Sequence, residues 1–293
     1  MYQRRHNSKR RYQRRRGGIG RAETSLPKPK RYMDINCNLG QGFGIYQNEY
    51  EETVLPYVTS VNIACGIHNG EPTTMARAVE AAKGYNLNIG ALVGYPDRQS
   101  NGEREMYFDV EELRATVLYQ LGALHALLQA NGLELKHVRT HGFLYKQLST
   151  DLLIAETVAK AIAEYSPWVT LIGLGGPVLY TACTNANIKV GQEILIDRRY
   201  RRDGHVLPYT KTIDGKRHLE DSASRAREFL QKGTVTSEDN SKLKINAETI
   251  HIPSDTKESI ELARIVWSMV PEPRALHSDK YKNYCADLAA LKS

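Results

Sequence analysis

Two histidines and two aspartates lie in polar clusters of this chain where they could support acid–base chemistry. His68 and His141 each follow a short apolar run and lie close to glycine. Imidazole titrates near neutral pH, so it can donate or accept a proton in catalysis. Asp34 and Asp197 lie in similar clusters and could orient such an imidazole. Because a buried histidine or a loop-capping aspartate can also be purely structural, a catalytic role depends on the fold bringing these groups together.

Nearly every apolar run predicted to be a strand ends in a polar or glycine-rich cluster. Amide, carboxylate and guanidinium groups there could bind a small polar substrate. The candidate substrate-binding residues are Asn36, Asn38, Gln41, Asp97, Glu193, Arg198 and Asp255. In a (β/α) barrel the carboxyl ends of all strands meet on one face, where active sites are built. We therefore expect these residues to share one site with the histidines and aspartates.

The segments that must position these residues alternate between short apolar runs and amphipathic stretches. Strands are predicted at 33–37, 60–65, 89–93, 137–141, 169–174, 188–196 and 249–252, and helices at 49–58, 72–83, 109–131, 150–165, 177–186, 219–231 and 256–269. The clearest helix is 109–131, where leucine and valine recur every three or four residues and Asp109 can cap the start. Seven β-then-α units favour an α/β barrel with seven or eight strands, and a doubly wound open sheet is the alternative.

The charge of the chain is unevenly distributed. The net charge is +7, yet residues 1–32 alone hold nine Arg, three Lys and one Glu. The remaining 261 residues carry 28 basic and 32 acidic side chains. With little to bury, residues 1–32 are predicted to form a disordered basic tail, before a barrel domain at 33–270 and an extension at 271–293. The tail is either simply solvated or an arm for nucleic acid or another anionic assembly.

Composition and cysteine spacing indicate the class of protein. Hydrophobic residues make up 41% and charged residues 25% of the chain, as in globular proteins. Four widely spaced cysteines without a CxxC pair favour reduced thiols and a cytoplasmic location. We expect no membrane association, because no apolar run approaches the roughly 18–20 residues of a membrane span. The start lacks the apolar region of a secretory signal, whereas its Arg-rich, acid-poor composition leaves an organellar transit peptide open.

Four ordered motifs resemble one known family. They are Asp-Ile-Asn-Cys-Asn-Leu-Gly-Gln-Gly-Phe-Gly at 34–44, Asn-Ile-Ala-Cys-Gly-Ile-His-Asn-Gly at 62–70, Gly-Tyr-Pro-Asp at 94–97 and His-Gly-Phe-Leu-Tyr at 141–145. On these motifs the chain is similar to the LamB/YcsF family, the A-type subunits of the bacterial 5-oxoprolinase, over roughly residues 33–270. The resemblance implies a barrel of the glycoside hydrolase/deacetylase kind. It also implies ATP-dependent opening of 5-oxoproline to glutamate together with two partner subunits.

The chain departs from the family pattern at four positions near strand ends. Asn38 and Gln41 stand where the family has Asp and Glu, and Leu92 and Pro253 stand where it has His. An amide keeps the shape and hydrogen bonding of a carboxylate but loses its charge and basicity. We therefore expect relaxed or changed chemistry. The chain has no GxxxxGK[ST] loop, so ATP would be bound in another manner or mainly by the partner subunits.

Three functional hypotheses follow. In the first, His141 or His68 is the acid–base group that opens a cyclic amide, Asp34 and Asp197 orient it, and Arg198 holds a carboxylate or phosphate. In the second, a catalytically silent barrel is recruited as a binding or assembly component through its basic tail. In the third, two His and an Asp hold a metal for deacetylase-like hydrolysis, which the two missing family histidines disfavour.

Overall fold

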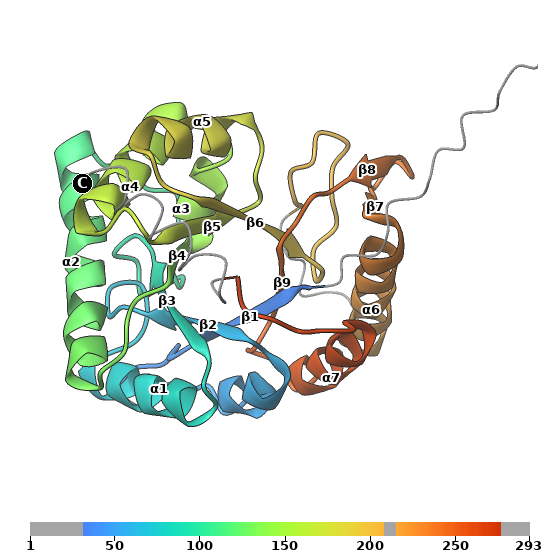
Figure 1. The fold of residues 1–293 in the computed structure, drawn as a ribbon, viewed down its shortest axis with the longest axis horizontal. Coiled ribbons are helices and arrows are strands. Elements are labelled where there is room, and N and C mark those ends of the chain that lie inside the picture. The colour runs from blue at the N-terminus through green and yellow to red at the C-terminus, as the bar shows by residue number, and fades with distance from the viewer. Residues whose placement is uncertain (1–31, 208–214, 277–293) are drawn as a thin grey trace, which may run out of the picture.

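A computed structural model of the chain describes residues 32–207 and 215–276, and its centre is a closed barrel of parallel strands in the order β1-β2-β3-β4-β5-β6-β9 (Figure 1). The strands are β1 (Asp34–Leu39), β2 (Ser60–Ala64), β3 (Asn88–Val93), β4 (His137–Thr140), β5 (Thr170–Gly173), β6 (Val190–Leu195) and β9 (Thr249–Ile252). Strand β9 pairs with both β6 and β1, which closes the barrel. The predicted α/β barrel is thus confirmed, and the open sheet was the wrong alternative.

Helices surround the barrel (Figure 1). They are the 3-10 helix η1 (Glu51–Tyr57) and the α-helices α1 (Pro72–Gly84), α2 (Val110–Ala130), α3 (Gly142–Gln147), α4 (Leu152–Tyr165), α5 (Pro177–Ala186), α6 (Gly215–Lys232) and α7 (Ser259–Met269). Helix α2 begins as predicted, because the Asp109 carboxylate accepts a hydrogen bond from the backbone N–H of Glu112. Its leucines at 113, 121, 124 and 128 are fully buried, so the predicted apolar face packs inward.

Two features of the structure are missing from the sequence-based prediction. Helix α3 directly follows β4, and an antiparallel hairpin of β7 (Thr234–Thr236) and β8 (Lys242–Lys244) lies between α6 and β9. Helix α3 has six residues and each hairpin strand has three. Segments this short do not show enough of a helical or strand period to be recognised.

The interior of the barrel is unusually polar for this architecture, which is commonly filled by branched apolar side chains. Residues two apart on a strand share a face, so Asp34, Asn36 and Asn38 all point inward from β1. Buried polar residues point inward from the neighbouring strands as well: Ser60, Asn62, His137, Arg139, Glu193, Thr249 and His251. The alternate residues of β1, such as Ile35 and Cys37, belong to the apolar core outside the barrel.

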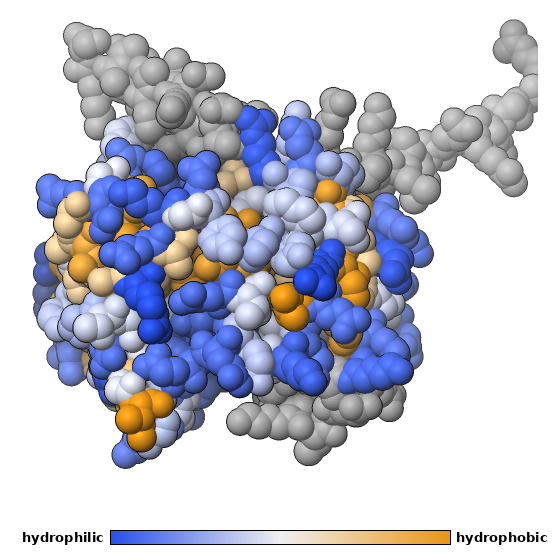
Figure 2. All heavy atoms as spheres, turned by 90° about the horizontal axis from the view of Figure 1, so that it is seen from below, coloured by the Kyte–Doolittle hydropathy of each residue, from blue (hydrophilic) through white to orange (hydrophobic). Residues whose placement is uncertain are grey.

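The remaining expectations concern the tail, the thiols and the surface. Residues 1–31 of the predicted tail and 277–293 of the predicted extension lie outside the described residues. Cys37, Cys65 and Cys183 are buried free thiols, and burial raises the pKa of Cys65 to about 12. Within the described ranges, no helix combines the length and apolar character needed to cross a membrane. Figure 2 shows one face of the molecule as mostly hydrophilic, with apolar side chains scattered across it.

Candidate active site

His68 and His141 lie together at the carboxyl end of the barrel. His68 is in the loop after β2, and His141 directly follows β4. Their rings stack with centroids 4.8 Å apart and an angle of 21° between the planes. Glycine is needed next to this pair, because a Cβ atom on Gly94 would lie 2.7 Å from Nδ1 of His68. The structure therefore brings these two predicted residues into one site.

Burial keeps both imidazoles neutral at physiological pH. Burial, with the nearby charge of Arg139, lowers the pKa of His141 to about 3. Burial also lowers the pKa of His68 well below its ordinary value. In the part of the chain that the structure describes, Nε2 of His141 and both ring nitrogens of His68 are buried without a hydrogen-bond partner. An unpaired buried polar atom costs about 1–3 kcal/mol, so a ligand that bonds to such an atom gains affinity.

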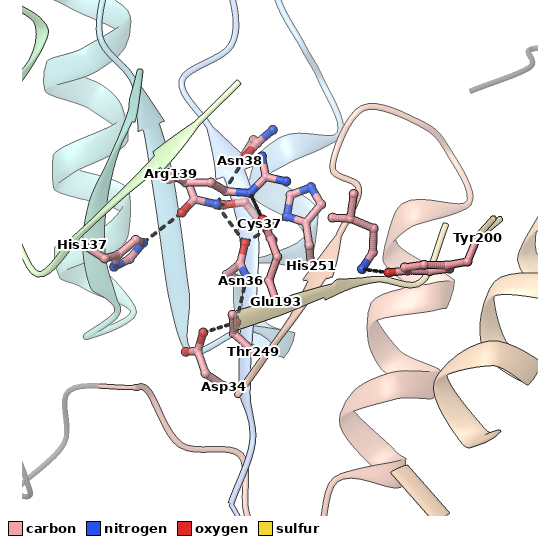
Figure 3. A network of polar contacts seen from close by, with 12 residues as sticks. Asp34, Asn36, Cys37, Asn38, His137, Arg139, Glu193, Tyr200, Thr249 and His251 are labelled. Atoms are coloured by element: carbon pink, nitrogen blue, oxygen red, sulfur yellow. Dashed lines mark hydrogen bonds and ion pairs between the residues drawn. The ribbon is translucent and has the colours of Figure 1, made fainter. Parts of the chain in front are cut away.

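A buried ion pair lies next to the histidines. Arg139, two residues before His141, donates from Nε to both carboxylate oxygens of Glu193 at 3.0 and 3.1 Å (Figure 3). Its guanidinium carbon lies 4.7 Å from the ring centroid of Tyr145, which follows His141 by one helical turn. Burial alone would lower the pKa of Arg139, but the Glu193 carboxylate outweighs it and the pKa lies above its ordinary value. Arg139 is therefore charged.

Asp197 and Arg198 form a second pair just after β6. The Nε atom of Arg198 lies 3.0 Å from Oδ2 of Asp197, and their side chains are 31% and 7% exposed. The other carboxylate oxygen of Asp197 is buried and has no hydrogen-bond partner among the described residues. The charge of Arg198 helps to lower the pKa of His141, so it acts within electrostatic range of that ring. Arg198 thus reaches solvent close to the histidines, where it can meet an anionic ligand.

Asn36 and Asn38 lie inside the barrel below these groups. Asn36 is fully buried and bonds to Asn62, Thr249 and His251 (Figure 3). Asn38 is 8% exposed, and its side-chain oxygen lies 3.3 Å from Nδ2 of Asn62. Asn36 is therefore committed to holding its neighbours, whereas Asn38 lies at the edge of the network.

Asp34 does not join the histidines. It is the first residue of β1, so it lies at the amino end of the barrel, opposite the site. Its carboxylate accepts hydrogen bonds from three hydroxyl groups around the starts of the neighbouring strands, those of Thr59, Ser60 and Thr249. The expectation that Asp34 directly orients the site histidines is therefore wrong, because the polar cluster that follows it in sequence runs the whole length of the strand.

Three other predicted residues serve local structure or lie at the surface. Burial would raise the pKa of Asp97, but hydrogen bonds from Ser100 and the backbone of Arg104 outweigh it and lower the pKa, so Asp97 braces its own loop. The backbone N–H of Gln41 donates to the Glu51 carboxylate at 2.9 Å. Asp255 is exposed in the loop after β9.

Sequence reasoning missed four residues of the site and its support. Arg139 shares a strand face with His141, and Tyr145 follows His141 by four residues on α3, so both spacings carried a usable signal. His251 occupies an inward position of the last strand, which alternation along β9 could also have indicated. Glu51 had no such signal, because it is buried only where η1 folds against the loop after β1.

The chain is similar in sequence to proteins of one known family. The LamB/YcsF family model matches residues 33–277. The chain belongs to the LamB/YcsF family. A relative from Bacillus thuringiensis subsp. konkukian (strain 97-27), named as the A-type subunit of 5-oxoprolinase, is 35% identical over 236 residues, covering 80% of this chain and 93% of the relative. One of the same name from Symbiobacterium thermophilum is 36% identical over 240 residues, covering 82% and 92%.

A solved structure also resembles this LamB/YcsF barrel. The lactam utilization protein from Thermus thermophilus superposes with a TM-score of 0.77 at 33% identity, covering 84% of this chain and all of that one. Leu92 is fully buried inside the barrel, level with Ala64 and Arg139 on the adjacent strands. Among the described residues, no group of three or more His, Cys, Asp or Glu side chains is placed to hold a metal ion.

Proposed function

We propose that this LamB/YcsF protein is the A-type subunit of a 5-oxoprolinase, which opens a small cyclic amide by hydrolysis. The observation that carries the proposal is the cluster of buried polar atoms at the carboxyl end of the barrel. Ring nitrogens of His68 and His141 and one oxygen of Asp197 have no partner there among the described residues, and Arg198 reaches solvent beside them. The relatives with this name support it, since the alignment covers more than nine-tenths of each.

The chemistry of 5-oxoproline matches these groups. Its carboxylate suits the guanidinium of Arg198, and the unpaired nitrogen of His141 can take up a proton during the reaction. Hydrolysis bonds the water oxygen to the carbonyl carbon, breaks the ring C–N bond and transfers a proton to the nitrogen, giving glutamate. In the free protein the low pKa of His141 makes it a weak base. The negative charge of a bound ligand would raise that pKa and strengthen His141 as a proton acceptor.

We assign ATP mainly to the partner subunits or to a site shared with them. A lactam is a stable amide, and ATP would activate it by phosphorylating its oxygen. The nucleotide phosphates require cations or free backbone N–H groups. Near the site, the Arg98 guanidinium donates to the carbonyls of Gly66 and Gly70, and Lys146 pairs with Glu103. Both cations are held by groups of the protein, and the single guanidinium of Arg198, itself beside Asp197, does not suffice for three phosphates.

Glutamate release tests the proposal. The full-length chain is purified with its associated subunits and supplied with 5-oxoproline and ATP. We expect one glutamate and one phosphate released per 5-oxoproline consumed, and no turnover by the chain alone. An assembly that contains the partner subunits, consumes no 5-oxoproline and releases no glutamate would contradict the proposed activity.

A second candidate is a catalytically silent barrel used as a binding or assembly component. Leu92 favours it, because a fully buried hydrocarbon side chain faces Arg139 where the family pattern has an imidazole. The basic segment 1–32 would then dock nucleic acid or a large complex. Under this hypothesis, deleting residues 1–32 abolishes partner capture while the barrel stays folded; capture that survives the deletion argues against it. Changing Asn38→Asp, Gln41→Glu, Leu92→His and Pro253→His together would then create turnover absent from the natural chain.

A further inference from the structure

A continuous chain of hydrogen bonds runs inside the barrel from Asp34 to His251 (Figure 3). The Thr249 hydroxyl contacts Oδ2 of Asp34. Nδ2 of Asn36 donates to Oγ1 of Thr249 at 2.7 Å, and Oδ1 of Asn36 lies 2.9 Å from Nδ1 of His251. All four residues lie on the paired strands β1 and β9. The chain therefore links the amino end of the barrel to a histidine near its carboxyl end.

The Asp34 carboxylate sets the direction of this chain from one end. The Thr249 hydroxyl donates to Oδ2 of Asp34, so the Thr249 oxygen accepts from Nδ2 of Asn36. Burial raises the pKa of Asp34, and the three hydroxyl donors around it act in the opposite sense. With its amide nitrogen used in this way, Asn36 presents its oxygen to His251. Only an N–H at Nδ1 of His251 can bond to that oxygen.

A backbone carbonyl requires the same orientation independently. Nδ2 of Asn62 lies 3.2 Å from the carbonyl oxygen of Cys37 and 2.9 Å from Oδ1 of Asn36. Since a carbonyl can only accept, the atom of Asn62 that faces it is the amide nitrogen, and the atom of Asn36 that this nitrogen meets is the oxygen. The two anchors agree, which removes the usual ambiguity between the oxygen and nitrogen of an amide.

The same network places a proton on the other ring nitrogen of a second histidine. Once the nitrogen of Asn62 faces Cys37, its oxygen faces Nε2 of His137 at 2.8 Å. That oxygen can only accept, so His137 carries its proton on Nε2. The barrel therefore specifies a proton on Nδ1 of His251 and a proton on Nε2 of His137.

We propose that His251 is a further ligand-binding residue of the active site, held as the Nδ1–H tautomer so that its bare Nε2 accepts a hydrogen bond from the substrate. Its Nδ1 faces Asn36, which leaves Nε2 on another edge of a ring that is 8% exposed. Figure 3 shows this ring beside the Arg139 guanidinium. Burial, then the charges of Arg139, Arg198 and His141, lower the pKa of His251 well below its ordinary value, so the ring is neutral.

The identity of the substrate rests on the proposed function, and its chemistry fits this acceptor. A lactam N–H is a hydrogen-bond donor, and a bare imidazole nitrogen accepts from it. With Arg198 for the carboxylate and His251 for the ring N–H, a small cyclic amide would be held at two points. His251 would then determine which nitrogen-containing cyclic compounds bind.

The tautomer can be measured without any substrate. Two-bond ¹H–¹⁵N correlation spectra are recorded on the full chain labelled with ¹⁵N-histidine at pH 7, with single His→Gln variants for assignment. We expect His251 protonated on Nδ1 only, and His137 with a proton on Nε2. A spectrum in which His251 is protonated on Nε2, or on both nitrogens, overturns the proposal. Because no turnover is needed, this result is independent of whether the protein is a 5-oxoprolinase.

A matched pair of variants tests the ligand contact. In His251→Asn the new amide lies near the position of Nδ1 and leaves nothing at Nε2, whereas in His251→Gln the amide reaches the position of Nε2. Binding of 5-oxoproline to the assembled complex is measured by calorimetry. We expect His251→Asn to weaken binding roughly tenfold, and His251→Gln to weaken it less. Equal binding by both variants and the natural protein overturns the contact. If 5-oxoproline does not bind at all, the ligand assignment fails with the proposed function while the tautomer result stands.

Discussion

The guanidinium of Arg139 and the carboxylate of Glu193 are bonded to each other inside the barrel, with Nε 3.0 and 3.1 Å from the two oxygens. Their side chains are 6% and 0% exposed, so water screens neither charge. Each charge is tolerated there only because the other is present. The pair thereby fixes Arg139 close to His141 and against the ring of Tyr145.

Removing one partner of this pair should be strongly destabilising. Glu193→Gln leaves the Arg139 charge buried, and we expect a loss of about 3–5 kcal/mol in the free energy of unfolding. Replacing both residues, as Arg139→Met with Glu193→Leu, should cost less because no charge is left unpaired. Urea denaturation at pH 7 measures both. The exposed pair Arg114–Glu164 is the control, and Glu164→Gln should cost less than about 1 kcal/mol. Equal losses from Glu193→Gln and Glu164→Gln would contradict this view.

His141 should make the protein less stable in acid. Its pKa in the folded protein is about 3, below the ordinary value of 6.5, so on acidification the unfolded chain binds the proton first. Stability is therefore lost as the pH falls from about 6.5 towards 3, at up to about 1.4 kcal/mol per pH unit for this ring. Urea denaturation at several pH values should show a shallower dependence for His141→Asn than for the natural chain. Identical slopes would show that His141 is not held neutral.

Glu51 should give the stability of the protein a pH dependence opposite to that from His141. Burial raises its pKa from 4.5 to about 7, so the folded protein binds the proton more tightly than the unfolded chain. Its contribution to stability is present at low pH and is lost as the pH rises from about 4.5 to 7. Glu51→Gln keeps an oxygen that can accept from the Gln41 N–H. Relative to the natural chain, its free energy of unfolding should therefore be higher at pH 8 than at pH 4 by about 1–3 kcal/mol. Urea denaturation of both proteins at the two pH values measures this, and a difference between variant and natural chain that does not change with pH would refute it.

Gly90 should be indispensable for packing inside the barrel. A Cβ atom there would lie 2.1 Å from the imidazole of His137. Gly90→Ala should therefore lower the free energy of unfolding by about 1–3 kcal/mol. A Cβ atom on Gly122, within α2, would meet no atom within 4 Å, so Gly122→Ala should instead add about 0.5–1 kcal/mol. Thermal denaturation of the two variants compares them, and a stable Gly90→Ala protein would contradict the contact.

The regular parts of the fold were predictable from local sequence patterns. The site was not, because its residues are set by how far each lies between the amino and carboxyl ends of the barrel. The cap at Asp109 and the leucines of α2 showed their roles in the sequence, because a long amphipathic helix repeats its signal. Asp34 and Asn36 look alike in sequence, yet one lies at the amino end of the barrel and the other bonds to His251. Only the register between β1 and β9 separates them. Glu51 is buried by the path of a loop, which no periodicity records.

Turnover by a His141 variant tests whether this ring is the acid–base group of the reaction. The complex of this chain with its associated subunits is supplied with 5-oxoproline and ATP, and glutamate release is measured for the natural chain, His141→Ala and the surface variant Lys160→Ala. We expect normal release with Lys160→Ala and at least a roughly 100-fold loss with His141→Ala, on the order of a lost acid–base group. Unchanged release from a folded His141→Ala complex would show that His141 is not the acid–base group.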